Sequence, residues 1–531
     1  MTSPVSHPSE VHHAGDTDAP LPLDGATLAS DGALARPLPR GADGFRSLGW
    51  RTGSGLDLRW AAAALAGLIA LCIAIQMAWP LATIGRHISL NNNEGWNAYW
   101  STRALTGQPI YTDIGSPLSN NYTPLSFYIV GWFGRAIGDL VLAGRILALA
   151  GLGGCALLVG LIATRLGKET RWGWAAAASF LVIAVTIAPR YIAADDPQWM
   201  AEAIQMIALW ILVQRPQFTP RRLIAACLIL LLAGLIKHNQ VALPLAITVG
   251  LAVHDRRALA IWMATGVAAT VLTLAALQGI YGPAFFDQVL HHQRVLHLYY
   301  IWPALWTTAF LIPAGVIAAV YLPRLPGWRR DPRLTMLVSF AVLGVILGIF
   351  ERFGTGVSQN AHFDALLAVT ILLGVVLVRS EQASLSAASR LALITLAIAP
   401  AAAKDLASLP RQAARWQDID RTDEAWRNAV RFLATRPGPI ACERPALCYW
   451  AGKPYALDFS NYGQKLRRIG DPWHLRERIA RREFGALVVI RDDRYAKGDA
   501  RLPYDYYALI DANYQVERVL PDDLYVMVPK R

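Results

Sequence analysis

The feature that most constrains the fold of this chain is a succession of about eleven apolar segments joined by short polar turns. A membrane-spanning helix needs roughly 17 to 25 mainly apolar residues, and shorter segments are tolerated inside a helical bundle. Of the 531 residues, 54% are hydrophobic and only 17% are charged, which is too apolar for a soluble protein of ordinary composition. We therefore predict a polytopic α-helical membrane protein whose spans lie near residues 60–80, 140–163, 173–190, 198–214, 222–236, 240–253, 258–279, 303–322, 333–350, 364–379 and 389–406.

The basic residues indicate the topology of these spans. The net charge is +12, but Lys and Arg gather in short clusters between apolar segments, such as "RLGKETR" (165–171) and "PRLPGWRRDPR" (323–333). Because Lys and Arg beside a span are retained in the cytoplasm, this pattern reflects topology and disfavours nucleic-acid binding. With the N-terminus inside and an odd number of spans, the region after about residue 407 is expected outside.

The chain divides into three predicted parts. Residues 1–54 are rich in Pro, Gly, Ser, Asp and His and have no apolar run for a core or a signal peptide, which indicates a disordered cytoplasmic tail. Residues 55–410 form the membrane domain, with juxtamembrane helices. Residues 411–531 contain an amphipathic helical pattern at 423–437 and strand patterns at 484–493 and 514–529, which predict a small extracytoplasmic α/β domain.

Cys442 and Cys448 lie in this last region. In an oxidising periplasm they can form a disulfide; two free thiols are the alternative, and the sequence leaves both open.

The first outer loop begins with "NNNEGWNAYW" (91–100). It predicts a helix from Glu94 to Thr106, capped by the asparagines and ended by Gly107, with Glu94 and Asn97 on one polar face. A carboxylate in the first turn is stabilised in its charged form by the helix dipole, so Glu94 is a candidate general base. The alternative is that Glu94 is only a favourable N-terminal residue.

Two further outer loops carry charge. In "YIAADDPQWMAEA" (191–203), two adjacent carboxylates, Asp195 and Asp196, stand at membrane level, where charges are expensive and mark functional sites. Helix capping by Asp196 would explain only one of them. In "LIKHNQVALP" (235–244), Lys237 and His238 interrupt an apolar hairpin, and a cation there suits an anionic headgroup or phosphate; a snorkelling lysine is the alternative.

Weaker signals come from Arg294, in the aromatic segment "FFDQVLHHQRVLHLYY" (285–300), and from His362, in "FERFGTGVSQNAHFD" (350–364). The first segment is suited to lie on a bilayer and line a lipid entrance. The histidines do not have the spacing of a zinc site.

Together, "NEGWNAYWSTRALTGQPIYTD" (93–113), "NNYTPLSFYIVGWFGR" (120–135), the Asp195 and Asp196 pair and "KHNQ" (237–240) resemble the GT-C glycosyltransferases. The similarity is to the bacterial branch with aminoarabinose, galacturonosyl and protein mannosyltransferases. It extends over roughly residues 60 to 410, in spacing more than in identity.

The resemblance implies an inner-membrane enzyme that moves a sugar, on the periplasmic side, from a polyprenyl-phosphate lipid to an envelope glycolipid, polysaccharide or protein. It implies a loop carboxylate as general base, here Glu94, and cations that stabilise the leaving phosphate. The sequence names no certain cofactor and leaves a divalent metal ion open. Asp195 and Asp196 are candidates for catalysis, for orienting the acceptor or for binding that metal ion. The predicted donor-phosphate ligands are Lys237, His238 and Arg294, and the predicted substrate contacts are Asn97, Tyr122 and His362.

Two departures from the family pattern bear on this hypothesis. The first-loop acid of the family is usually aspartate, and this chain has Glu94. In aminoarabinose transferases a basic residue precedes the proline of the "YxP" element, whereas this chain has Thr123. The second departure shifts the predicted phosphate binding toward Lys237 or Arg294. The rival hypotheses are an oligosaccharide ligase with a pyrophosphate-lipid donor, a polytopic transporter, and a sensor or scaffold.

Overall fold

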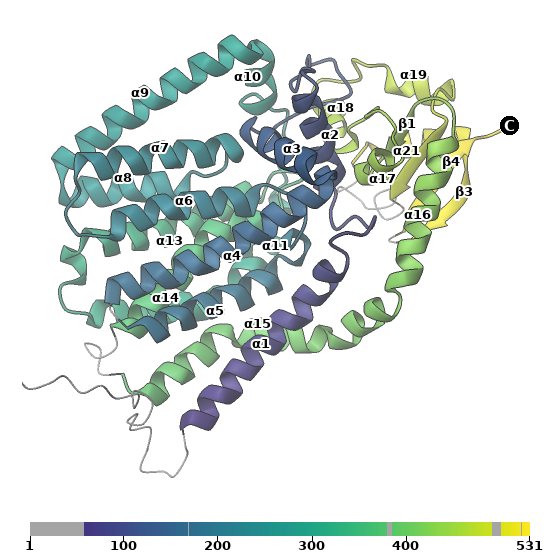
Figure 1. The fold of residues 1–531 in the computed structure, drawn as a ribbon. Coiled ribbons are helices and arrows are strands. Elements are labelled where there is room, and N and C mark those ends of the chain that lie inside the picture. Colours follow the sequence, from purple (N-terminus) through teal and green to yellow (C-terminus); the bar gives the residue numbers. More distant parts are fainter. Residues whose placement is uncertain (1–57, 168, 380–384, 491–500, 522) are drawn as a thin grey trace, which may run out of the picture. The chain divides into compact units, whose positions relative to one another are not determined.

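A computed structural model describes residues 58–531 apart from residues 168, 380–384, 491–500 and 522 (Figure 1). The predicted tail, residues 1–54, lies outside the described residues. Helices dominate residues 58–435, and they run, in chain order, as α1 (Leu58–Ala82), α2 (Asn93–Leu105), α3 (Leu125–Ile137), α4 (Leu140–Gly167), α5 (Thr170–Ile187), α6 (Gln198–Val213), α7 (Pro220–Ile236), α8 (Ala242–His254), α9 (Arg256–Tyr281), α10 (Pro283–Val289), α11 (Ile301–Ala309), α12 (Ile312–Tyr321), α13 (Pro332–Glu351), α14 (Phe363–Val378), α15 (Ala387–Gln417) and α16 (Ile419–Thr435).

One helix covers all or most of each of ten predicted spans, whereas the predicted span 303–322 consists of two helices, α11 and α12. Within the described ranges, seven helices are long and apolar enough to cross a membrane, namely α1, α4, α5, α9, α13, α15, and α14 with the turn before it. An eighth span results if α11 and α12, which are bent by 60° with respect to each other, count as one. The chain is thus a multi-pass membrane protein, whereas the total of eleven spans stays a prediction because α6, α7 and α8 are short.

The helices at the centre of the helical part are buried by other helices, whereas those at its periphery are exposed. In α14, 94% of the apolar window is buried within the protein, whereas the corresponding share in α9 is 11%. A helix that is apolar on all sides belongs inside a bundle or against lipid, and these two helices illustrate both cases. Helices α4, α5 and α13 pack on α14, and α15 packs along α1 (Figure 1).

The C-terminal region contains a four-stranded sheet of order β1-β2-β4-β3. Strand β1 (Ile440–Cys442) pairs in parallel with β2 (Ala486–Ile490), and β4 (Leu524–Pro529) is antiparallel to both β2 and β3 (Tyr514–Leu520). The remaining helices are short and lie between the strands in the sequence: α17 (Pro445–Trp450), α18 (Phe459–Arg468), α19 (Leu475–Ala480) and α21 (Tyr504–Asn513). The predicted helix at 423–437 is confirmed by α16, and the strand patterns are confirmed by β2 and by the pair β3 and β4. Residues 491–493 of the first strand pattern lie outside the described residues.

Helices cover both faces of the sheet. Successive side chains of a strand point to opposite faces, so neighbouring residues pack in different clusters. In β2, Val488 packs in a cluster with Trp426 and Leu433 of α16. Its neighbour Val489 packs in a second cluster with Tyr462 of α18 and Ile510 of α21. This double burial explains why β2 is apolar throughout rather than alternating.

Candidate functional site

Helix α2 begins at Asn93, one residue before the predicted start, and buries Glu94 and Asn97. The side chain of Asn91 accepts a hydrogen bond from the backbone N of Asn93 at 2.8 Å. Gly107 has a φ of 70° just after the helix, a conformation that glycine adopts without strain. The predicted helix and its terminating glycine are confirmed, whereas the predicted capping is not, because Asn92 at the N-cap makes no side-chain capping hydrogen bond.

Glu94 forms a buried ion pair with Arg145 of α4. The exposed fractions of the two residues are 0% and 1%, and Arg145 donates from Nε to Oε1 at 2.7 Å and from Nη2 to Oε2 at 3.1 Å. Glu94 also accepts from the backbone N of Leu90 at 2.6 Å and of Asp195 at 3.4 Å. A carboxylate offers about four lone-pair sites, so this arrangement occupies all of them.

The rest of the Arg145 guanidinium holds the segment that enters α2. Its Nη1 and Nη2 atoms donate to four backbone carbonyl oxygens, those of Thr83, Ile84, Arg86 and Ile88. The ion pair therefore ties α1, α2 and α4 together. Sequence reasoning missed Arg145, although a single arginine within the apolar stretch "LVLAGRILALAG" (140–151) was a signal for a buried charge with a partner.

Asp195 lies beside this ion pair and is only partly satisfied. Its backbone O accepts from Asn97 Nδ2 at 2.5 Å, but its buried Oδ2 atom has no hydrogen-bond partner among the described residues. Burial raises the pKa of the Asp195 carboxyl well above its usual range, and the negative charges of Glu94 and Asp196 raise it further. A carboxyl group with one oxygen that has no partner among the described residues is placed to exchange a proton with a bound molecule.

The next residue, Asp196, faces a different set of partners. Its Oδ2 accepts from Asn93 Nδ2 at 2.6 Å, and its Oδ1 accepts from the backbone N of Gln198 at 2.9 Å. Lys237 Nζ lies 3.6 Å from Oδ1 and 3.4 Å from the centroid of the Tyr122 ring. Four segments far apart in the sequence thus meet at one point, where Asp196 and Lys237 are buried.

The side chain of Lys237 is buried, with 4% of the residue exposed, and this environment lowers the pKa of its ammonium group. Burial lowers the pKa of Lys237 to about 8; the negative charge of Asp196 acts in the opposite direction, and the positive charge of Arg294 lowers it further. The ammonium group remains charged at neutral pH, with a single long contact to one carboxylate and a ring face beneath it. A cation held in this way is available to a second anion.

The other predicted ligands lie around this point. His238 is exposed, with its ring centroid 6.5 Å from that of Tyr122. Arg294 is half-buried and donates to the backbone O of Thr355 at 3.3 Å. His362 is fully buried, and neither of its ring nitrogens has a hydrogen-bond partner in the described part of the chain.

A second polar cluster, absent from the sequence predictions, lies deeper among α6, α13 and α14. Gln198 Nε2 donates to Glu202 Oε1 at 2.8 Å, and the Gln205 amide donates to both Glu202 and Asp364. The cluster borders a small cavity that Asn239, Glu351 and Asn360 also line. Glu202 in "QWMAEAIQM" (198–206) was the available signal, since a carboxylate within an apolar span needs polar partners.

The possible metal role of Asp195 and Asp196 is not supported by their placement. Their side chains face different partners, and residues 58–531, outside the gaps named above, hold no group of three or more His, Cys, Asp or Glu side chains placed to bind a metal ion. The residues present do not fit a divalent-metal site in this arrangement.

No protein-family profile matches the sequence, and no curated protein matches it. Solved structures do resemble the fold. ArnT from Cupriavidus metallidurans in the apo state matches with a TM-score of 0.53 and 14% identity over 87% of this chain and 98% of that one. The same protein bound to undecaprenyl phosphate matches with a TM-score of 0.55 and 12% identity over 88% and 97%.

An oligosaccharyltransferase from Archaeoglobus fulgidus matches with a TM-score of 0.49 and 12% identity over 89% of this chain and 74% of that one. The two ArnT structures show that this chain has a fold similar to that of ArnT, which agrees with the GT-C fold that the sequence resemblance predicted.

Proposed function

We propose that this chain, which has the fold of a GT-C membrane protein, is a glycosyltransferase that takes a sugar from a polyprenyl-phosphate lipid. The observation that carries the proposal is the buried meeting of Asp196, Lys237 and Tyr122 beside the partly unpaired Asp195. It provides a cation and a proton acceptor next to each other. The undecaprenyl phosphate bound to the similar ArnT structure supports a polyprenyl-phosphate partner.

Lys237 is the group that we assign to the donor phosphate. When the bond between the anomeric carbon and the phosphate oxygen breaks, negative charge develops on that oxygen, and a cation already fixed in a water-poor site stabilises it without reorganisation. In the free protein, Asp196 neutralises this cation at 3.6 Å. A lipid phosphate would compete for the same ammonium group, with Arg294 adding positive charge nearby.

Asp195 is the carboxylate that we assign as general base. It would accept the proton of the acceptor hydroxyl as the oxygen attacks the anomeric carbon, and its Oδ2 has no other partner among the described residues. Glu94 was the sequence-based choice, and that role stays a prediction. The four donors around Glu94 favour a positioning role instead, because the backbone N of Asp195 is one of them.

We propose that the site faces the periplasm of a bacterial inner membrane, with residues 411–531 on the same side. Clusters of Lys and Arg in the opposite turns support this orientation. The disulfide between Cys442 and Cys448 supports an oxidising compartment for the C-terminal region. A periplasmic acceptor would be an envelope glycolipid, a polysaccharide or a protein.

The test is transfer of labelled sugar by the purified full chain in lipid nanodiscs supplied with short-chain polyprenyl-phosphate sugars. We expect Asp195→Asn to lower kcat by about 100-fold or more, the scale of general-base catalysis. Glu94→Gln is compared at equal amounts of folded protein, because it also disturbs the Arg145 ion pair.

Asp405→Asn is the matched control for this test. Asp405 is another buried carboxylate, bonded by Gln76 and Thr186 between α1, α5 and α15, and its variant should keep kcat within about 3-fold, since it meets no group of the site. If Asp195→Asn keeps the wild-type kcat and Glu94→Gln loses most of it, Glu94 and not Asp195 is the general base. Transfer by the wild type only from pyrophosphate lipids would favour the ligase hypothesis.

A further inference from the structure

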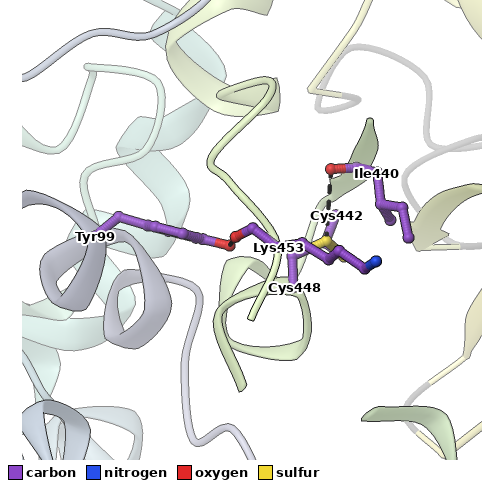
Figure 2. The surroundings of a disulfide bond; sticks show 5 residues. All are labelled: Tyr99, Ile440, Cys442, Cys448 and Lys453. Atoms are coloured by element: carbon purple, nitrogen blue, oxygen red, sulfur yellow. Dashed lines mark hydrogen bonds between the residues drawn. A yellow bond between two sulfur atoms is a disulfide. The ribbon is translucent and has the colours of Figure 1, made fainter. Parts of the chain in front are cut away.

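The C-terminal region reaches the candidate site through a short segment closed by a disulfide. Cys442 ends β1 and Cys448 lies in α17, with a sequence separation of 6. Cys448 Sγ also approaches the backbone O of Ile440 at 3.7 Å (Figure 2). The disulfide therefore fixes α17 against the edge strand of the sheet.

Helix α17 in turn packs directly on helix α2. A Cβ atom added at Gly95 would lie 2.0 Å from the backbone N of Ala446 and 2.3 Å from the carbonyl carbon of Pro445. No side chain separates the two helices at this point, so a shift of α17 reaches the backbone of α2 immediately. Gly95 lies between Asn93 and Asn97, whose side chains bond to Asp196 and Asp195.

Two side chains of α2 extend this contact along the C-terminal region. Tyr99 OH donates to the backbone O of Lys453 at 2.7 Å (Figure 2), and its ring stacks on Tyr455 with centroids 4.6 Å apart. Trp96 Nε1 donates to Asp458 Oδ2 at 2.9 Å, and both residues are buried. One face of α2 thus lies on the C-terminal region while its polar start lies in the candidate site.

We propose that residues 442–458, closed by the Cys442–Cys448 disulfide, are a positioning element of the glycosyltransferase site, and that Trp96 and Tyr99 are the positioning residues that transmit their placement to α2. The proposal rests on the proposed function for its catalytic consequence, because it assigns a role to the C-terminal region in the same reaction. The structural consequence, a fixed α2, stands independently of that reaction.

The physical basis is that α2 carries groups for both aspartates. Asn93 bonds the Asp196 side chain and Asn97 bonds the Asp195 backbone, so a displacement of α2 changes the position of the proposed base relative to the proposed phosphate cation. Misplacement of reacting groups by about 1 Å costs up to about 100-fold in rate. Opening the disulfide would displace the proposed base and lower kcat. KM would rise less, because Lys237, which is proposed to bind the donor phosphate, belongs to a loop outside α2 and residues 442–458.

The first experiment compares the Cys442→Ala/Cys448→Ala variant with wild type in the full chain in nanodiscs. We expect kcat to fall by about 10-fold with KM changed less than about 3-fold, and hydrogen exchange of the peptide covering residues 93–105 to become faster. The matched control is Cys155→Ala/Cys227→Ala, which removes two buried free thiols from α4 and α7 and should change neither quantity.

Reduction of the wild type provides a second route to the same state. A water-soluble phosphine takes up oxygen from water while the disulfide gains two electrons and two protons to give two thiols, and thiol counting by mass spectrometry reports its extent. We expect the reduced wild type to match the double variant in kcat and exchange, and the double variant to be insensitive to the phosphine. If the reduced protein, with two free thiols at Cys442 and Cys448, keeps the wild-type kcat and hydrogen exchange, the proposal is overturned. Two free thiols at these positions in the untreated protein would overturn it as well.

Tyr99→Phe tests the transmission without touching the disulfide. It removes only the hydroxyl that bonds to Lys453, and we expect a smaller fall in kcat at unchanged KM. Tyr462→Phe is its control, because Tyr462 OH donates to Asp471 at 2.6 Å within the C-terminal region and does not contact α2. Equal effects of the two variants would mean that loss of domain stability, and not positioning, lowers kcat.

The exchange measurement also separates the two proposals. If wild type transfers no sugar from any polyprenyl-phosphate donor, the proposed function fails, while the exchange of residues 93–105 still decides whether the disulfide holds α2.

Discussion

The two buried ion pairs next to α2 differ in how completely their charges are satisfied. Glu94 and Arg145 meet at 2.7 Å and 3.1 Å, and every other donor and acceptor of the two groups is used by the protein. Asp196 and Lys237 meet once, at 3.6 Å, and the ammonium group has a ring face as its other neighbour. The first pair holds segments together, whereas the second leaves a cation available to a ligand.

This contrast agrees with the general energetics of buried charges. Removing water from an ion costs several kcal/mol, and the geometry of the ion pair decides how much of this cost the attraction between the two charges offsets. A fully bonded guanidinium recovers more of that cost than an ammonium group with one long contact. A bound phosphate would supply what Lys237 lacks, so the weaker pair is the better candidate for substrate binding.

The largest expected effect comes from breaking the well-satisfied pair. Arg145→Met leaves Glu94 buried without a counter-charge and releases four backbone carbonyls, so the free energy of unfolding should fall by about 3–5 kcal/mol. Unfolding in mixed detergent micelles, followed by circular dichroism, measures the change. The Arg145→Met/Glu94→Gln variant should recover part of the loss, because its glutamine is neutral; stability like that of wild type in Arg145→Met would remove the distinction between the pairs.

Breaking the weaker pair should affect transfer more than stability. Lys237→Met removes the proposed phosphate cation, and we expect kcat/KM to fall by about 100-fold or more, the scale of one lost electrostatic contact to a developing oxyanion. Lys237→Arg keeps the charge and should retain much of the activity. Steady-state transfer and thermal unfolding are compared in the same preparations, and full activity of Lys237→Met would move phosphate binding to another group.

The smallest effect is a pH dependence that distinguishes the pairs without mutation. Because the pKa of Lys237 is lowered to about 8 from an ordinary 10.5, kcat/KM should decrease above about pH 8 by up to tenfold per pH unit as the ammonium group loses its charge. Between about pH 8 and 10.5 the unfolded chain binds this proton and the folded one does not, so Lys237 makes the free energy of unfolding rise over that window. Lys237→Arg should abolish both trends, and a decrease in transfer that persists in that variant would assign the titration to a different group.

Local patterns predicted the elements around the site well. Apolar segments predicted the helices, the asparagine run and Gly107 predicted α2, and the β-branched residues after residue 484 predicted strands, because each signal depends on neighbours within a few residues. The loops that carry Asp195, Asp196 and Lys237 were identified for the same reason, since charges in apolar surroundings are conspicuous. Their individual partners were not predictable, because these lie about 40 to 115 residues away in the sequence.

The sequence by itself determined that the chain is a multi-pass membrane protein with charged loops, since the length of the apolar segments sets these features. The GT-C fold was predicted by the resemblance of its motifs to that family, and not by apolar length. Only the tertiary structure decided which charge meets which. It paired Glu94 with Arg145, left Asp195 Oδ2 without a partner among the described residues, set Lys237 over Tyr122, and placed the disulfide-closed α17 against Gly95. Packing brings distant segments together, and burial makes the presence or absence of one partner decisive for a charged group.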